Sequence, residues 1–250
     1  MDIIIVYFVY LEKKMKIKAV FFDLDGTLLP MDQDVFVKGY FHGLVGLLAP
    51  KGYDARGVGG ALLRGIDAMV KNDGSKTNEQ VFWDSFAAVL GEGVREETEL
   101  LDEFYHTDFQ KLSTLCGYTE MAKALVDMLN DRGITTVLAT NPLFPSIATE
   151  SRMRWAGLSP SDFKIYTTYE GSRYCKPNLK YYEELVSEIG LAPEECLMVG
   201  NDVSDDMVAE NLGMKVFLLT DCLINNTDRS VEEFSHGNFD DLKKYIEELI

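Results

Sequence analysis

The sequence is short of positive charge, of paired cysteines and of long apolar runs, and each shortage narrows what the protein can be. Its 250 residues include 24 lysines and arginines against 41 aspartates and glutamates, a formal net charge of -17. Because a protein with this charge repels polyanions, we expect neither nucleic acid nor an anionic membrane as a main partner. A phosphorylated ligand would need a local positive pocket or a metal ion.

The cysteines stand singly, without the C-x-x-C spacing of metal or redox sites. This pattern indicates neither a disulfide framework nor a zinc site. It fits a reducing environment, so we predict a cytoplasmic location. The four cysteines are Cys116, Cys175, Cys196 and Cys222.

The apolar run at residues 1–11 resembles a targeting segment only superficially. It is too short to cross a bilayer core of roughly 30 Å, and it lacks the basic start and small-residue cleavage site of a secretion signal. Met15 opens a segment that already has a complete strand pattern. We therefore expect no membrane role and set residues 1–14 apart as an extra N-terminal segment of unknown role.

Secondary-structure patterns differ between the two halves of the chain. Residues 17–22 are β-branched and aromatic and stop at a cluster of carboxylates and glycine, which predicts a buried strand before a functional loop. Helical patterns without an intervening strand follow at 34–48, 55–70, 78–90 and 96–109. Farther along, helices at 118–132, 145–155, 179–189, 204–212 and 240–249 alternate with strands at 135–140, 164–168, 195–199 and 215–219.

The alternation predicts an α/β fold, a doubly wound, Rossmann-like parallel sheet with helices on both faces. We assign residues 15–29 and 115–250 to this core and residues 30–114 to a smaller α-helical cap domain. In the cap, Phe82, Trp83 and Phe86 are expected to pack in its interior rather than to form a stacking platform. An open parallel sheet places its ligand crevice at the carboxyl ends of its strands, where several polar clusters occur.

The first polar cluster contains Asp23 and Asp25, separated by one leucine directly after the first strand. In an extended geometry both side chains leave the same face and can address one ligand. Carboxylates so close repel each other unless a cation lies between them, which suggests Mg²⁺. Taken alone, the cluster also fits an ordinary capped turn.

Two further loops carry groups that suit a phosphate. The strand at 135–140 ends in Thr140 and Asn141, whose hydroxyl and free backbone N–H groups can hold a phosphate oxygen. Lys176 precedes a proline, which holds it extended, so its ammonium can project into a crevice and offset phosphate charge. Judged alone, the first loop is more typical of an ordinary turn and Lys176 of a solvated surface lysine.

The last cluster follows the strand at 195–199 and contains Asp202, Asp205 and Asp206. Asp202 stands where a third carboxylate facing the metal is needed, and Asp206 lies one helical turn later. Asp205 is expected to complement the dipole of the helix that begins there, although it also competes with Asp202 as a metal ligand.

Taken together and in this order, the four clusters resemble the haloacid dehalogenase superfamily of phosphohydrolases. The signatures are D-L-D-G-T-L from Asp23, the strand ending in Thr140, the Lys176-Pro177 pair, and G-N-D-x-x-x-D ending in Asp206. They cover the core, about two thirds of the chain. A helical segment inserted after the first signature resembles the family's helical cap.

The resemblance implies a mechanism of phosphoester hydrolysis through an aspartyl-phosphate. Asp23 would attack phosphorus, and Asp25 would protonate the leaving oxygen and then activate water. Mg²⁺ would be held by the Asp23 side chain, the Asp25 backbone carbonyl and Asp202. Thr140 and the backbone of Asn141 would grip the phosphate.

In the same scheme, Lys176 would neutralise the phosphate and orient Asp23, and Asp206 would support Lys176 or a metal-bound water. Because a departing halide needs no acid, the carboxylate of Asp25 favours phosphoryl transfer over dehalogenation. The implied substrate is a small phosphorylated metabolite, acted on by a monomer or homodimer. A phosphomutase of the same superfamily and a non-catalytic protein on this scaffold are the alternatives.

Overall fold

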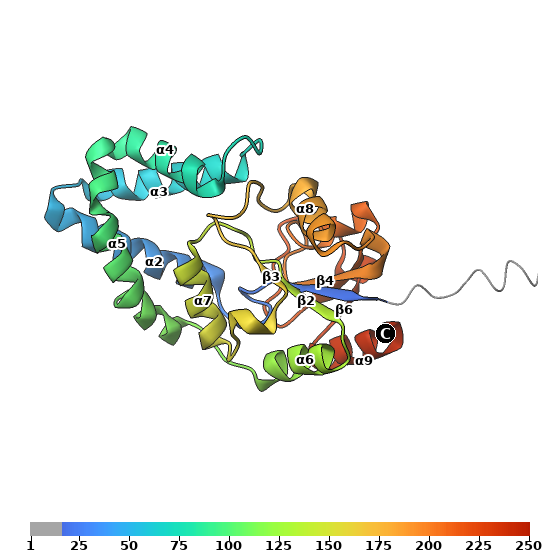
Figure 1. The fold of residues 1–250 in the computed structure, drawn as a ribbon. Helices are drawn as coiled ribbons and strands as arrows, with labels where there is room; N and C mark the ends of the chain where they lie inside the picture. The colour runs from blue at the N-terminus through green and yellow to red at the C-terminus, as the bar shows by residue number, and fades with distance from the viewer. Residues whose placement is uncertain (1–16) are drawn as a thin grey trace, which may run out of the picture.

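The computed structural model describes residues 17–250, so the extra N-terminal segment at 1–14 lies outside the described residues (Figure 1). Within the described part, six strands form one sheet in the order β3-β2-β1-β4-β5-β6, and every neighbouring pair is parallel. The predicted doubly wound parallel sheet is therefore confirmed. The strands are β1 Ala19–Phe22, β2 Thr135–Leu138, β3 Ile165–Tyr166, β4 Cys196–Gly200, β5 Lys215–Leu219 and β6 Ser235–Gly237.

Strand β1 lies at the centre of the sheet because its four residues are apolar on both faces and all are buried. Val20 and Phe22 pack on one face, in a cluster that includes residues of the helices α6 Glu120–Asp131, α7 Ser146–Trp155 and α9 Phe239–Leu249. Ala19 and Phe21 pack on the other, against the helix α8 Leu179–Ile189. Burial on both faces explains why a strand of only four residues is stable at the centre of the sheet.

Between β1 and β2 the chain forms a group of helices that stands to one side of the sheet (Figure 1). We call residues 30–114 the helical insert. Its helices are α2 Gln33–Leu48, α3 Ala55–Val70, α4 Asn78–Leu90 and α5 Thr98–His106, with short 3-10 turns at Ala49–Lys51, Glu92–Glu97 and Phe109–Leu115. The start of α4 is set by a reciprocal capping box between Thr77 and Gln80.

Two predicted helices differ from the structure, and one strand was not predicted. The helix expected at 96–109 is broken into α5 and its flanking 3-10 turns, and the one expected at 204–212 is a 3-10 helix at Met207–Leu212. In the second case Asp202 Oδ1 accepts the backbone N–H groups of Ser204 and Asp205, which would otherwise open a helical turn. Strand β6 was missed because Ser-His-Gly has no apolar pattern, and it pairs only with β5, at one edge of the sheet.

The insert is joined to the core by the first residue of α4. Asn78 is fully buried, and its side-chain amide lies 3.3 Å from Pro142 O, 3.4 Å from Tyr174 O and 3.3 Å from Cys175 Sγ. Asn72 Nδ2 donates to Asn78 Oδ1 at 2.9 Å. We call these interactions the Asn78 contact. It holds α4 against two core loops that carry predicted site residues.

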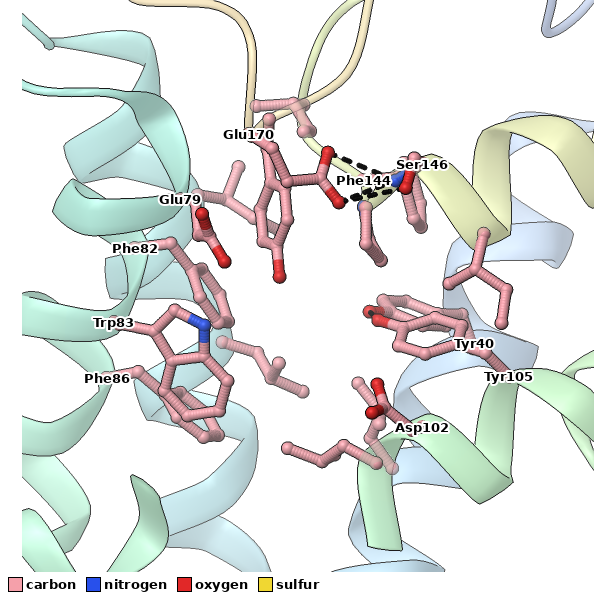
Figure 2. A pocket seen from close by; sticks show the side chains of 18 of the residues that line it. Tyr40, Glu79, Phe82, Trp83, Phe86, Asp102, Tyr105, Phe144, Ser146 and Glu170 are labelled. Carbon is pink, nitrogen blue, oxygen red and sulfur yellow. Dashed lines mark hydrogen bonds between the residues drawn. The ribbon is translucent and has the colours of Figure 1, made fainter. Parts of the chain in front are cut away.

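Beside this contact, the insert and the core loops enclose a cavity of about 450 Å³ (Figure 2). Phe82, Trp83 and Phe86 of α4 line one side of it, and Tyr40 of α2 and Tyr105 of α5 line another. The three aromatic residues of α4 do pack on one another as predicted, but they also form a wall of this cavity. None of the helices in residues 17–250 is long and apolar enough to span a membrane.

Candidate active site

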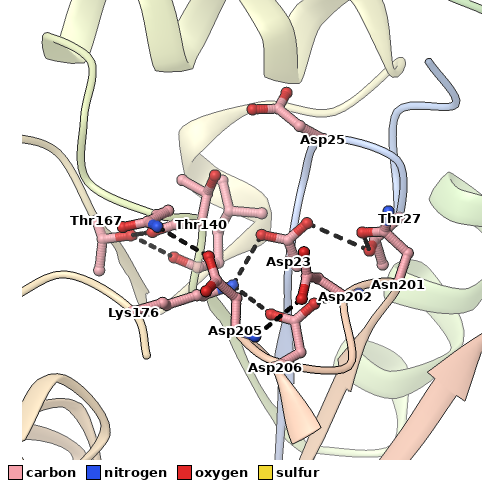
Figure 3. A network of polar contacts seen from close by, with 12 residues as sticks. Asp23, Asp25, Thr27, Thr140, Thr167, Lys176, Asn201, Asp202, Asp205 and Asp206 are labelled. Atoms are coloured by element: carbon pink, nitrogen blue, oxygen red, sulfur yellow. Dashed lines mark hydrogen bonds and ion pairs between the residues drawn. The ribbon is translucent and has the colours of Figure 1, made fainter. Parts of the chain in front are cut away.

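The predicted site residues come from the loops that follow four adjacent strands, β3, β2, β1 and β4 (Figure 3). Asp23 directly follows β1, and its backbone N–H bonds Val199 O of β4 at 2.9 Å. On the other side, Ala139 N donates to Phe22 O at 2.7 Å, which brings Thr140 alongside. Parallel pairing with matched ends thus places the loops after β1, β2 and β4 in one crevice.

Lys176 is the central cation of the crevice. Its side chain is almost fully buried, and Nζ lies 2.8 Å from Asp23 Oδ1 and 2.6 Å from Asp206 Oδ1. Burial alone would lower the pKa of Lys176, but the carboxylates of Asp206 and Asp23 outweigh it and raise the pKa well above the usual value. The ammonium is therefore charged and fixes the orientation of Asp23.

Asp206 ties Lys176 to the loop after β4. Its Oδ2 accepts the backbone N–H of Asp202 at 3.0 Å while Oδ1 accepts from Lys176. A Cβ at Gly200 would collide with the Asp206 carboxylate, so this close approach requires glycine. Both sides of the Asp206 carboxylate are thus engaged in holding the geometry of the crevice.

Asp202 presents one free carboxylate oxygen. Oδ1 accepts Ser204 N at 2.7 Å, Ser204 Oγ at 2.8 Å and Asp205 N at 3.0 Å. No residue in the range 17–250 donates to Oδ2. Asp205 instead accepts from Asn141 Nδ2 at 3.1 Å, and burial raises its pKa. Among residues 17–250, each of the two competing candidates thus keeps one carboxylate oxygen that accepts no hydrogen bond.

Two hydroxyl groups that were not predicted from the sequence bond the backbone of the loop after β2. Thr167 Oγ1 and Tyr181 OH donate to Thr140 O at 2.6 and 2.8 Å. Asn141 Oδ1 is buried without a hydrogen-bond partner among the described residues. Thr167 follows β3 and Tyr181 lies on α8, so the Thr140 loop is fixed by two neighbouring elements.

Thr27 and Asn201 form a second link that the sequence did not reveal. Thr27 Oγ1 lies 3.0 Å from Asn201 Oδ1 and 3.3 Å from Asp23 Oδ2, and Asn201 Nδ2 donates to Cys222 O at 2.7 Å. Gly26 has φ +84°, and a Cβ there would strike Asn201. The turn after Asp23 therefore needs glycine both for its backbone conformation and for space.

The prediction that Asp25 shares a face with Asp23 was wrong. Its side chain points away from the cluster and pairs with the guanidinium of Arg152, a fully buried residue of α7 (Figure 3). The reason is the turn after β1, where Thr27 N and Leu29 N both bond Leu24 O, so the alternation of a strand no longer applies. Only the backbone of Asp25 stays near Asp23.

Arg152 was not predicted, and it gives Asp25 an unusual environment. Burial raises the pKa of Asp25 to about 6, although the charge of Arg152 opposes the shift. Asp25 Oδ1 is buried and accepts no hydrogen bond from the described residues. Arg152 also donates to Ala148 O and Thr149 Oγ1 and lies 4.2 Å from the centre of the Phe144 ring.

The crevice suits a hard divalent cation with few protein side-chain ligands. Lys176 is its one cation among the described residues, against four carboxylates. This excess of negative charge would repel a phosphate unless a cation offset it. Across residues 17–250, however, no three aspartate, glutamate, histidine or cysteine side chains converge closely enough to form a metal cage. The carboxylates of Asp23 and Asp202 are donors that this crevice offers.

Comparison with known proteins places these features in a family. A family model described as haloacid dehalogenase-like hydrolase matches residues 17–213. A phosphatase structure from Thermococcus onnurineus is similar at a TM-score of 0.58 and 20% identity, covering 92% of this chain and 98% of that one. A 2-haloacid dehalogenase from Pseudomonas syringae is similar at 0.63 and 19%, covering 94% and 100%. No curated protein matches the sequence.

Proposed function

Because the chain belongs to the haloacid dehalogenase-like hydrolases, we propose that it is a Mg²⁺-dependent phosphomonoesterase that forms an aspartyl-phosphate on Asp23. The observation that carries this proposal is the buried Lys176, held between Asp23 and Asp206. The proposed nucleophile, Asp23, and a phosphate substrate are both anionic and would repel each other. A charged lysine beside Asp23 reduces this repulsion. The solved structures of similar fold include both phosphatases and dehalogenases, so the residues of the site must decide between them.

In the first half-reaction, a carboxylate oxygen of Asp23 attacks phosphorus and the bond from phosphorus to the leaving oxygen breaks. Lys176 holds Asp23 in line and offsets charge on the phosphate, while the Thr140 hydroxyl and the backbone of Asn141 hold its oxygens. Asp25 supplies the proton that the leaving oxygen takes up.

In the second half-reaction, Asp25 takes a proton from water, whose oxygen attacks phosphorus. The bond between phosphorus and Asp23 then breaks, and inorganic phosphate leaves. For both tasks the Asp25 side chain has to leave Arg152 and turn toward the crevice. In the position paired with Arg152, burial raises its pKa to about 6.

Asp23, Asp202 and the backbone carbonyl of Asp25 would hold Mg²⁺, which Asp206 would support by fixing the Asp202 backbone. When bound, the metal offsets negative charge on the phosphate and the nucleophile. A halide leaves without a proton, so a dehalogenase has no use for the carboxylate of Asp25. This is our reason for placing the chain among the phosphatases of its fold.

We further propose that residues 30–114 act as a cap over a core made of residues 15–29 and 115–250. The Asn78 contact supports this division, since it seats the insert on the two loops that carry Thr140 and Lys176. The proposal includes a small phosphorylated metabolite as substrate and a cytoplasmic location. All four cysteines are free, as a reducing environment requires.

The test is hydrolysis of p-nitrophenyl phosphate by purified protein with Mg²⁺ and with EDTA. We expect Asp23→Asn to abolish turnover while circular dichroism stays unchanged, and EDTA to abolish turnover of the unmodified protein. Asp131→Asn, an exposed residue of α6, is the matched control. Near-normal activity of Asp23→Asn would overturn the assignment of the nucleophile. Transfer of the phosphoryl group to a second substrate, with no free phosphate, would identify a mutase instead.

A further inference from the structure

We propose that the cavity beside the Asn78 contact binds the leaving group of the substrate, and that this group is a flat aromatic body carrying a positive charge. The inference rests on the proposed phosphatase function and narrows its substrate class. It excludes sugar phosphates as the preferred substrates. Three features of the cavity support it: its shape, its charge and its place beside the crevice.

The shape of the cavity favours a ring. Its volume of about 450 Å³ lies in the range typical of small-molecule sites. The rings of Phe82 and Phe86 stack at 5.1 Å with an interplanar angle of 19°, and Trp83 stands edge-on to Phe86 at 5.9 Å. Tyr40 and Tyr105 face them across the open space, with their hydroxyls 2.8 Å apart (Figure 2). Aromatic walls on two sides suit a planar apolar ligand better than a polyhydroxylated one.

The charge of the cavity favours a cation. Glu79, Asp102 and Glu170 all line it, whereas no lysine or arginine does and His106 is its one basic residue among those described. Glu170 is satisfied, because its carboxylate accepts the N–H and the hydroxyl of Ser146 at the start of α7. Glu79 has no such partner in residues 17–250, and its carboxylate points into the cavity (Figure 2).

Burial raises the pKa of Glu79, and the nearby charge of Glu170 raises it further. An ammonium group on the ligand would relieve this repulsion, and a carboxylate group would add to it. The same lining rules out the phosphate itself as the occupant, since a dianion would meet three carboxylates and no lysine or arginine. The cavity is therefore complementary to the part of a substrate that leaves.

The cavity lies beside the crevice, and two sets of side-chain contacts link their linings. Asn78 bonds Pro142 O, two residues past Thr140, and Cys175 Sγ, next to Lys176, while the adjacent residue Glu79 lines the cavity. Phe144 also lines the cavity, and its ring lies under the Arg152 guanidinium that pairs with Asp25. The two linings are thus adjacent, so a substrate would have to extend past these residues to place its leaving group in the cavity.

The experiment compares three phenyl phosphates that differ only in the para substituent, which is aminoethyl, ethyl or carboxyethyl. We expect kcat/KM to fall in that order, with about tenfold between the ammonium and neutral esters. Glu79→Gln should remove the preference for the ammonium ester over the neutral ester. Glu99→Gln, an exposed residue of α5 outside the cavity lining, should change none of the three.

Acetyl phosphate separates a failure of this inference from a failure of the proposed function. Its leaving group is too small to fill the cavity, so its Mg²⁺-dependent hydrolysis reports the crevice alone. Equal kcat/KM for the ammonium and carboxylate esters, with acetyl phosphate hydrolysed, would overturn the inference and leave the phosphatase intact. Absence of turnover for every ester and for acetyl phosphate would overturn both.

Discussion

The polar crevice and the aromatic cavity are neighbours, but the chain builds them in opposite ways. The crevice gathers single polar residues from the ends of adjacent strands, where parallel pairing sets their positions within narrow limits. The cavity gathers ring surfaces from three helices of the insert and two core loops, where packing alone sets the geometry. If our proposals hold, the core supplies a general reaction and the insert supplies its selectivity.

The largest effect should come from removing the central cation of the crevice. Lys176→Met leaves Asp23 and Asp206 buried without their common partner, so we expect a loss of about 3–5 kcal/mol of unfolding free energy. Turnover of every ester should fall by about a thousandfold or more, because the nucleophile loses both its orientation and its neighbouring positive charge. Urea denaturation and initial rates measure the two effects.

Lys164→Met, an exposed lysine before β3, is the matched control and should change neither quantity. Retention of more than a tenth of the activity by Lys176→Met would show that the crevice does not work as a unit. The aromatic cavity would then be the better candidate for the site of chemistry.

The next largest effect should come from Asp25→Asn, and it should depend on the leaving group. Alkyl phosphates need a proton on the departing oxygen, so their kcat should fall by about a hundredfold to a thousandfold. The first step with p-nitrophenyl phosphate needs no such proton, so a burst of p-nitrophenol should persist while the following turnover slows. Rapid-mixing absorbance measurements distinguish the two phases, and equal losses in both with every ester would contradict the assigned role of Asp25.

The smallest effect should come from the Asn78 contact, which joins the two regions. Asn78→Ala removes the donor to the buried Pro142 O and the acceptor of Asn72 Nδ2, so we expect a loss of about 1–3 kcal/mol of unfolding free energy. KM should rise several-fold for aromatic esters and little for acetyl phosphate. Asn211→Ala, on the exposed end of a 3-10 helix, serves as the control. A uniform rise in KM for all substrates would mean that the contact serves the crevice alone.

The sequence was most informative about groups whose positions follow from a strand end. Asp23, Thr140 and Asp202 could be assigned to one crevice because the carboxyl ends of parallel strands share an edge, and the structure brings Lys176 and Asp206 to them. Apolar periodicity also predicted the bounds of α3, α4 and α8 correctly. These features depend on local pattern and on a general rule of sheet topology.

The sequence was least informative about contacts between distant segments. Arg152 looks like an ordinary surface arginine on a helix, yet it is buried against a carboxylate 127 positions away. The direction of Asp25 depends on the turn that follows it, and the burial of Asn78 depends on two loops more than sixty positions distant. Such contacts are properties of the assembled fold, since no local spacing encodes them.

The Asn78 contact has a thermodynamic consequence for any pair of ligands that meet across it. A ligand in the cavity could stabilise the start of α4, and a ligand in the crevice could require the same positions of the loops at 142 and 174–175. Each ligand would then increase the affinity of the protein for the other by an equal factor. An inhibitor that fills only the space between the helices would then tighten the hold on inorganic phosphate, and product would leave more slowly. The buried amide of Asn78 would thus couple ligand binding in the cavity to ligand binding in the crevice.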